Sequence, residues 1–156
     1  MDVRGLTART AATRTAAVLA SFLALATSGC ALSAGSGSSA ESARESLYAT
    51  LDQTEQLLGG TWDNQDDPTS RGCVIPLWVE GEMFPALRVG AAPLRADVAV
   101  ETVSDYWRDL ELDLSTTDVG DVLELKGEGE FGDVLILRVS AEAMTLQGES
   151  ECRPES

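Results

Sequence analysis

The sequence contains no histidine, and this absence bears directly on catalysis. Histidine is the side chain whose ordinary pKa lies nearest neutrality, so the commonest general base is missing. The chain also lacks a G-x-S-x-G nucleophile turn, a glycine-rich phosphate loop and a C-x-x-C pair. A pair of cysteines without histidine cannot complete a zinc site unless carboxylates join it. We therefore expect a protein that is not an enzyme and that holds no metal or cofactor.

Basic residues are also scarce. The chain has 11 Lys and Arg against 26 Asp and Glu, for a net charge of −15. Three of the Arg and one of the Asp lie in residues 1–29, so the remainder of the chain carries −17. Such a surface repels nucleic acid phosphates and anionic lipid headgroups. We expect no nucleic acid partner, and membrane contact through an anchor rather than through a basic face.

No apolar run is long enough to remain in a membrane. Residues 15–27, TAAVLASFLALAT, are uncharged and follow Arg4, Arg9 and Arg14. A spanning helix needs about 20 apolar residues, whereas a basic start followed by a short apolar run is typical of a secretory signal. We therefore expect an exported protein whose first residues are removed.

The cleavage site has two interpretations. Residues 24–26, Ala-Leu-Ala, fit the cleavage site of an ordinary secreted protein. Residues 27–30, Thr-Ser-Gly-Cys, resemble a bacterial lipobox, in which the cysteine receives lipid and becomes the first mature residue. Thr27 stands where Leu is usual, which leaves the efficiency of this processing open.

The cysteine count favours the lipobox. The chain has three cysteines, Cys30, Cys73 and Cys152, and an odd thiol in an exported protein needs an explanation. A lipid on Cys30 leaves two cysteines that can pair. We predict a lipoprotein signal peptide over residues 1–29, a flexible Gly/Ser tether over 30–39 and a single domain over 40–156. The protein is then lipid-anchored at the extracytoplasmic face of the cell membrane.

Cys73 and Cys152 are predicted to form a structural disulfide, because two cysteines outside the cytoplasm usually pair. The bridge would close a loop of about 80 residues, which stabilises by roughly 4–5 kcal/mol in the chain-entropy model.

Hydrophobic periodicity predicts an α+β fold. Apolar residues at helical spacing indicate helices over 40–58 and 94–110. Strands are expected over 73–79 and 83–89, on either side of a turn at 80–82, and then over 112–119, 121–126, 133–139 and 143–149. This order favours a mostly antiparallel sheet with both helices packed on one face.

The polar loop over residues 61–72 is the predicted contact surface. Trp62 is the aromatic residue expected to touch a partner, and Asp63, Asp66 and Asp67 accompany it. The acids resemble a calcium loop, but the sixth and twelfth positions are Pro68 and Val74, where an EF-hand needs Gly and Glu. We interpret them as a solvated turn, with a cation site of another kind left open.

Two segments carry a family resemblance. TWDNQDDPTSRGC at 61–73 and MTLQGESEC at 144–152, together with the lipobox region, resemble small lipoproteins of actinobacterial cell envelopes of the LppA-type group. The resemblance implies an envelope location and a paired Cys73–Cys152, and it implies no established activity.

The function expected from these features is that of a membrane-anchored, outward-facing envelope lipoprotein acting as a non-enzymatic binding or interaction module. Its partners would be the membrane, through lipid on Cys30, and an envelope protein or small ligand. The alternative is a solute- or cation-binding accessory lipoprotein of a transporter.

Overall fold

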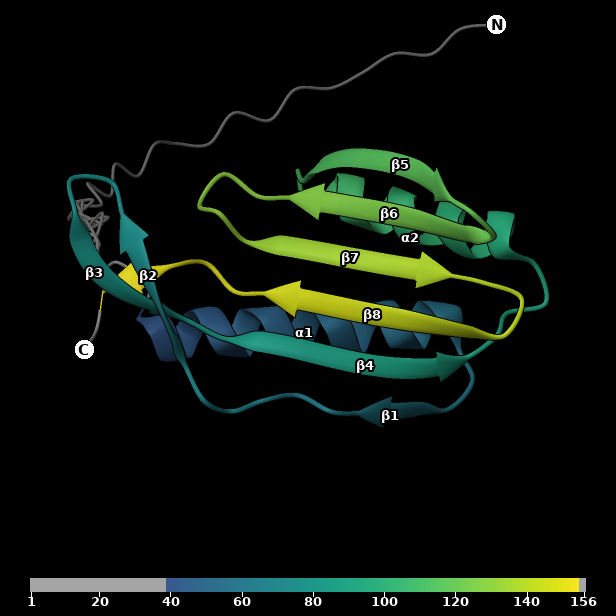
Figure 1. Ribbon diagram of the computed structural model, residues 1–156, viewed down its shortest axis with the longest axis horizontal. Helices are drawn as coiled ribbons and strands as arrows, with labels where there is room; N and C mark the ends of the chain where they lie inside the picture. The colour runs from purple at the N-terminus through teal and green to yellow at the C-terminus, as the bar shows by residue number, and fades with distance from the viewer. Residues whose placement is uncertain (1–38, 155–156) are drawn as a thin grey trace, which may run out of the picture. The chain divides into compact units, whose positions relative to one another are not determined.

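The computed structural model describes residues 39–154, which belong to one compact unit (Figure 1). The predicted signal peptide, Cys30 and all of the predicted tether except Ser39 lie outside the described residues. The described elements, in chain order, are α1 (Ala40–Leu58), β1 (Trp62–Asn64), β2 (Arg71–Ile75), β3 (Val79–Met83), β4 (Pro85–Ala91), α2 (Ala96–Asp109), β5 (Asp113–Val119), β6 (Val122–Glu128), β7 (Val134–Val139), β8 (Ala143–Glu149) and β9 (Arg153–Pro154).

A six-stranded sheet forms the body of the domain. Its strand order is β1-β4-β8-β7-β6-β5, and all neighbouring strands run antiparallel. β4 pairs with β8 along its whole length, from Pro85 opposite Glu149 to Ala91 opposite Ala143. The predicted hairpin of residues 121–126 and 133–139 forms as β6 and β7. The predicted α+β fold with a mostly antiparallel sheet is confirmed.

Both helices lie on the same face of this sheet, as predicted (Figure 1). Each turns one apolar stripe inward: α1 buries Leu47 and Leu51, and α2 buries Val103 and Trp107. The Trp107 indole is fully buried, and its Nε1 donates a hydrogen bond of 3.2 Å to Thr54 Oγ1 on α1. Strand residues complete the core, chiefly Leu125, Leu135, Leu137, Val139, Met144 and Leu146. The outward side of α2 is exposed and carries Asp97, Glu101, Asp105 and Asp109.

A small second sheet, with strand order β2-β3-β9, corrects one prediction. The expected turn at 80–82 lies inside β3, and the chain turns at 76–78 instead. Gly81 is required by close packing rather than by a turn. A Cβ at this position would lie 2.7 Å from the carbonyl oxygen of Arg153 and 3.0 Å from Cys152 Sγ. A glycine inside a strand often marks such a close approach of two backbones.

The segment 61–72 is also more ordered than the predicted polar loop. Its first residues form β1, which pairs with β4, and its end begins β2. The Trp62 ring lies against Gly90, where an added Cβ would come within 2.8 Å of the ring. Since Gly90 leaves room for the indole, Trp62 can pack beside the core and hold β1 at the sheet edge.

A buried arginine ties these elements together. Arg88 on β4 is only 2% exposed. Its guanidinium donates to Asp52 at 2.5 Å, to Glu55 at 2.9 Å and to Asp66 at 3.0 Å. The ring of Tyr48 lies 5.8 Å away. Burial by itself would lower the pKa of Arg88, but the hydrogen bonds from its guanidinium to the three carboxylates outweigh burial and raise the pKa above its ordinary value.

Removing this guanidinium should destabilise the protein strongly. We expect Arg88→Met to cost about 3–5 kcal/mol of unfolding free energy, since Asp66 and Glu55 would remain poorly solvated and unpaired. Arg88→Lys should lose less stability, because lysine keeps the positive charge and lacks only the planar guanidinium with its several N–H donors. Urea unfolding measures both. Arg108→Met, which removes an exposed pair with Asp105, is the matched control and should change stability by less than about 1 kcal/mol. Equal effects at the two arginines would contradict the role of Arg88.

Candidate functional site

The small sheet is held to the end of the chain by a disulfide. Cys73 on β2 is bonded to Cys152, with the two Cα atoms 6.0 Å apart and a sequence separation of 79. The predicted bridge is confirmed. Because β3 pairs with both β2 and β9, the bridge fastens the outer strands of a sheet that is only three strands wide.

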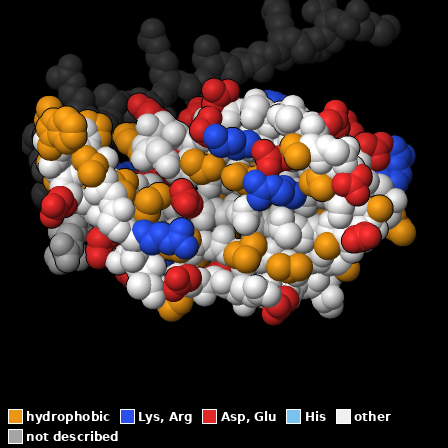
Figure 2. Space-filling model, in the orientation of Figure 1, with side chains coloured by type: hydrophobic (Ala, Val, Ile, Leu, Met, Phe, Trp, Pro, Cys, Tyr) orange, Lys and Arg blue, Asp and Glu red, His pale blue; other side chains and the backbone are white. Residues whose placement is uncertain are grey.

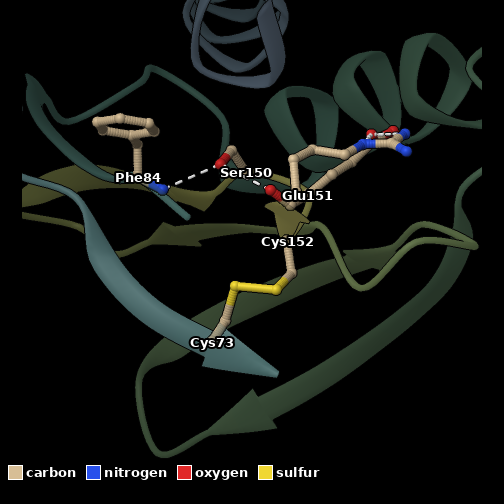
Figure 3. The surroundings of a disulfide bond; sticks show 6 residues. Cys73, Phe84, Ser150, Glu151 and Cys152 are labelled. Carbon is tan, nitrogen blue, oxygen red and sulfur yellow. Dashed lines mark hydrogen bonds and ion pairs between the residues drawn. A yellow bond between two sulfur atoms is a disulfide. The ribbon is translucent and has the colours of Figure 1, made fainter. Parts of the chain in front are cut away.

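The contacts around Cys152 explain why residues 148–152 have the pattern Gly-x-Ser-x-Cys (Figure 3). Gly148 leaves room for Leu47 of α1, since a Cβ there would lie 2.6 Å from that side chain. The buried Ser150 accepts a hydrogen bond from the Phe84 backbone N–H at 2.9 Å, and its own N–H donates to the Phe84 carbonyl at 3.0 Å. The motif therefore joins helix packing, strand pairing and the disulfide over five consecutive residues.

The tip of the β2–β3 hairpin is apolar and exposed. Leu77 and Trp78 are 92% and 90% exposed, and Val74 and Val79 lie beside them on the strands. Figure 2 shows hydrophobic side chains gathered at this end of the molecule, over the hairpin. A cluster of this kind, on a surface otherwise rich in acids, is typical of an interaction site.

The backbone of the tip is strained. Leu77 has φ of 75° and Trp78 has φ of 64°, in the left-handed region that costs an L-residue other than glycine roughly 1–2 kcal/mol. Hairpin turns of this kind normally use Asn or Gly. Strained residues of this kind cluster at binding sites, where the surrounding structure maintains them. The disulfide and the pairing with β9 supply that support.

Trp62, the predicted contact residue, has a structural role. Its ring packs beside the core, and its Nε1 donates a hydrogen bond of 3.0 Å to the carbonyl of Gly59. The indole is half-buried, so it presents far less surface than Trp78.

The acids of the predicted contact loop do not converge. Asp66 turns inward to Arg88, whereas Asp63 and Asp67 are exposed. Asp63 accepts a hydrogen bond from Gln65 Nε2, and Asp67 accepts one from the Thr69 backbone N–H at 2.9 Å, which lowers the pKa of Asp67. Within residues 39–154, no group of three or more Asp, Glu, Cys or His is placed to hold a metal ion. The bond from Thr69 to Asp67 is that of an Asp-initiated turn, whereas the expectation of a solvated Asp66 is wrong because Arg88 draws it inward.

A groove of about 420 Å³ opens next to the same segment, beside the ends of β4, β7 and β8. Its base is apolar and its rim is polar. Pro85, Leu87, Val134 and Ile136 line the base, and Gln65, Asp67, Arg71, Gln147 and Glu149 line the rim. An apolar base with a few polar groups is the usual composition of a small-molecule site.

Sequence reasoning placed Trp78 within a strand and missed the exposed tip. The run CVIPLWV has the composition of a buried strand, so its middle gives no turn signal except Pro76. The available clue to the turn was Pro76, four residues before Glu80-Gly81-Glu82. Proline has no backbone N–H to donate to a neighbouring strand, so it disfavours a continuous strand at this point.

Gly81 offers a test of how the hairpin is held. We expect Gly81→Ala to reduce the unfolding free energy by about 1–3 kcal/mol, because the new methyl group would overlap the Arg153 carbonyl. Thermal unfolding under non-reducing conditions measures the loss. Gly72→Ala in β2 is the matched control, since a Cβ there meets nothing within 4 Å. If the two variants unfold at the same temperature, the close packing against β9 is not what requires glycine.

None of the described helices combines the length and apolar composition needed to span a membrane.

Comparison with known proteins shows the fold alone. No protein-family model matches the chain, and no curated protein sequence matches it. Among solved structures, the chain is similar to a DUF4853 family protein from Actinomyces odontolyticus, with a TM-score of 0.54 and 13% sequence identity. The match covers 69% of this chain and 62% of that protein, so it spans less than two thirds of the other chain's length. The chain therefore shares its fold with an actinobacterial protein.

Proposed function

We propose that the protein is a membrane-anchored, outward-facing envelope lipoprotein that acts as a non-enzymatic binding or interaction module. Lipid on Cys30 is the anchor, residues 30–39 are the tether, and the domain formed by 40–156 presents the contact surface. The LppA-type resemblance of the segments 61–73 and 144–152 belongs to this proposal.

The observation that carries the proposal is the pairing of the cysteines. Cys73 and Cys152 are bonded to each other, so Cys30 is the one cysteine that this disulfide does not use. It follows Ser28 and Gly29 at the end of an uncharged run. Disulfides persist in oxidising compartments, which supports export. A predicted export signal that ends at a third cysteine is most simply explained by lipidation of that cysteine.

The surface supports binding rather than catalysis as the domain's task. The exposed apolar cluster lies on the stapled hairpin, away from the acidic face of α2. The chain contains no histidine. Shape and apolar contact, rather than proton transfer, are what this surface can offer to another molecule.

The anchor and the disulfide can be tested together. We expect the protein taken from the membranes of its own host to have the mass of a chain starting at Cys30 plus acyl groups. Two alkylatable thiols should appear only after reduction. Intact mass spectrometry with and without reductant before alkylation measures both.

Two results would count against the anchor. One is a chain cut after Ala26, and the other is an uncut chain. In either case Cys30 would carry no lipid, and its thiol would be alkylated even without reductant.

The groove favours a second candidate, a solute-binding accessory lipoprotein of a transporter. Its apolar base and polar rim are suited to a small organic solute or a peptide side chain. If this is its role, a sugar or peptide panel should contain a compound that raises the thermal unfolding temperature, because a ligand that binds the folded state stabilises it. Leu87→Lys at the base should abolish that rise, and Val98→Lys on the exposed side of α2 should preserve it. A flat response to the whole panel would retire this candidate.

A further inference from the structure

The tip of the β2–β3 hairpin lies at the same end of the domain as the start of α1. Arg44, in the second turn of α1, places its guanidinium 5.2 Å from the ring of Phe84, the residue that follows β3. α1 also contacts β3 and β9. Figure 1 shows the first turns of α1, the hairpin and β9 together at one end, with β4 leaving that end and β8 returning to it. The described part of the chain, which begins at Ser39 and α1, therefore starts beside the base of the hairpin.

The dimensions allow the anchor and the tip to reach one surface. β3 has five residues, and at about 3.3 Å per residue it carries the tip roughly 15 Å beyond Phe84. Cys30 and Ala40 are ten positions apart in the sequence, and an extended chain of that length spans at most about 35 Å. A domain held by a lipid on Cys30 can therefore rest its hairpin tip on the bilayer that holds the lipid.

The chemistry of the tip is suited to a lipid interface. Residues 74–79, VIPLWV, carry no charge, although the chain from Cys30 onward carries −17. The acidic surface is repelled by anionic headgroups, so an uncharged projection can approach a bilayer where the rest of the domain cannot. A Trp side chain, with an apolar ring and a polar N–H, favours the boundary between headgroups and acyl chains. Leu77 beside it supplies a purely apolar group.

We propose that the Leu77–Trp78 tip inserts into the interface of the membrane that carries the anchor, and so sets the orientation of the domain on that membrane. This inference rests on the proposed function, since the anchor keeps the tip at a high effective concentration near the lipid. The groove beside β4 is then held at a constant distance from the bilayer.

Tryptophan fluorescence of the full-length lipidated protein tests the insertion. The protein is reconstituted into phosphatidylcholine vesicles with brominated acyl chains, which quench tryptophans that enter the bilayer. We expect quenching of Trp78 alone, because Trp107 is fully buried and Trp62 packs beside the core. Trp78→Phe should remove the quenched component of the emission. Leu77→Asp, which keeps the reporter, should abolish the quenching. Leu94→Asp, at a fully exposed leucine outside the hairpin, should leave it unchanged.

Flotation of the same vesicles separates the two proposals. If the protein fails to float with the vesicles, the anchor at Cys30 is wrong and the proposed function falls with the inference. If the protein floats and Trp78 is not quenched, or if Leu77→Asp is quenched like the unmodified chain, the insertion is wrong and the anchor stands. Trp78 that is shielded only at high protein concentration, or only after a second protein is added, would show that the tip docks onto protein. That outcome also overturns the insertion.

Discussion

The described domain depends on one buried charge. Arg88 projects from the middle of β4, where it binds two carboxylates of α1 and one from the segment before β2. A lone guanidinium at 2% exposure would be too costly to bury, so the three acids are a condition of the fold rather than an addition to it. Because Asp66 also accepts a hydrogen bond from the Leu87 backbone N–H, the same network fixes the path of the chain between β1 and β2. The groove and the hairpin both follow from that path.

The second constraint acts on the three-stranded sheet β2-β3-β9. Within the described domain no helix covers both faces of this sheet, and much of it is exposed. Its stability comes from the Cys73–Cys152 bond, from Gly81 packed under the backbone of β9, and from the buried Ser150 that joins Phe84 to the end of β8. These contacts maintain a turn in which two large apolar residues have positive φ. The contacts at the base of the hairpin therefore stabilise it, and the strained backbone is confined to Leu77 and Trp78 at the tip.

This division of roles shapes what the surface can do. The helices and the face of the sheet that they cover hold the core, and the exterior of α2 is acidic and exposed. The uncovered face of the sheet carries the groove, and the stapled hairpin carries the apolar tip. Two distinct contact features therefore lie on elements whose positions are set by Arg88 and by the disulfide.

The sequence by itself determined the elements whose pattern is local. Helical spacing predicted α1 to the residue and α2 to within two residues, alternation predicted β6 and β7, and the cysteine count predicted the disulfide. Tertiary structure decided the rest. Asp66 and Arg88 are 22 residues apart, so no local pattern shows that the acid turns inward. Gly81 reads as a turn residue until β9 is seen to pack against it. Trp62 packs beside the core instead of forming the expected contact surface, and Trp78 is the exposed tryptophan, because burial depends on what lies opposite each ring. Gly90 leaves space for Trp62, and nothing in the described domain covers Trp78.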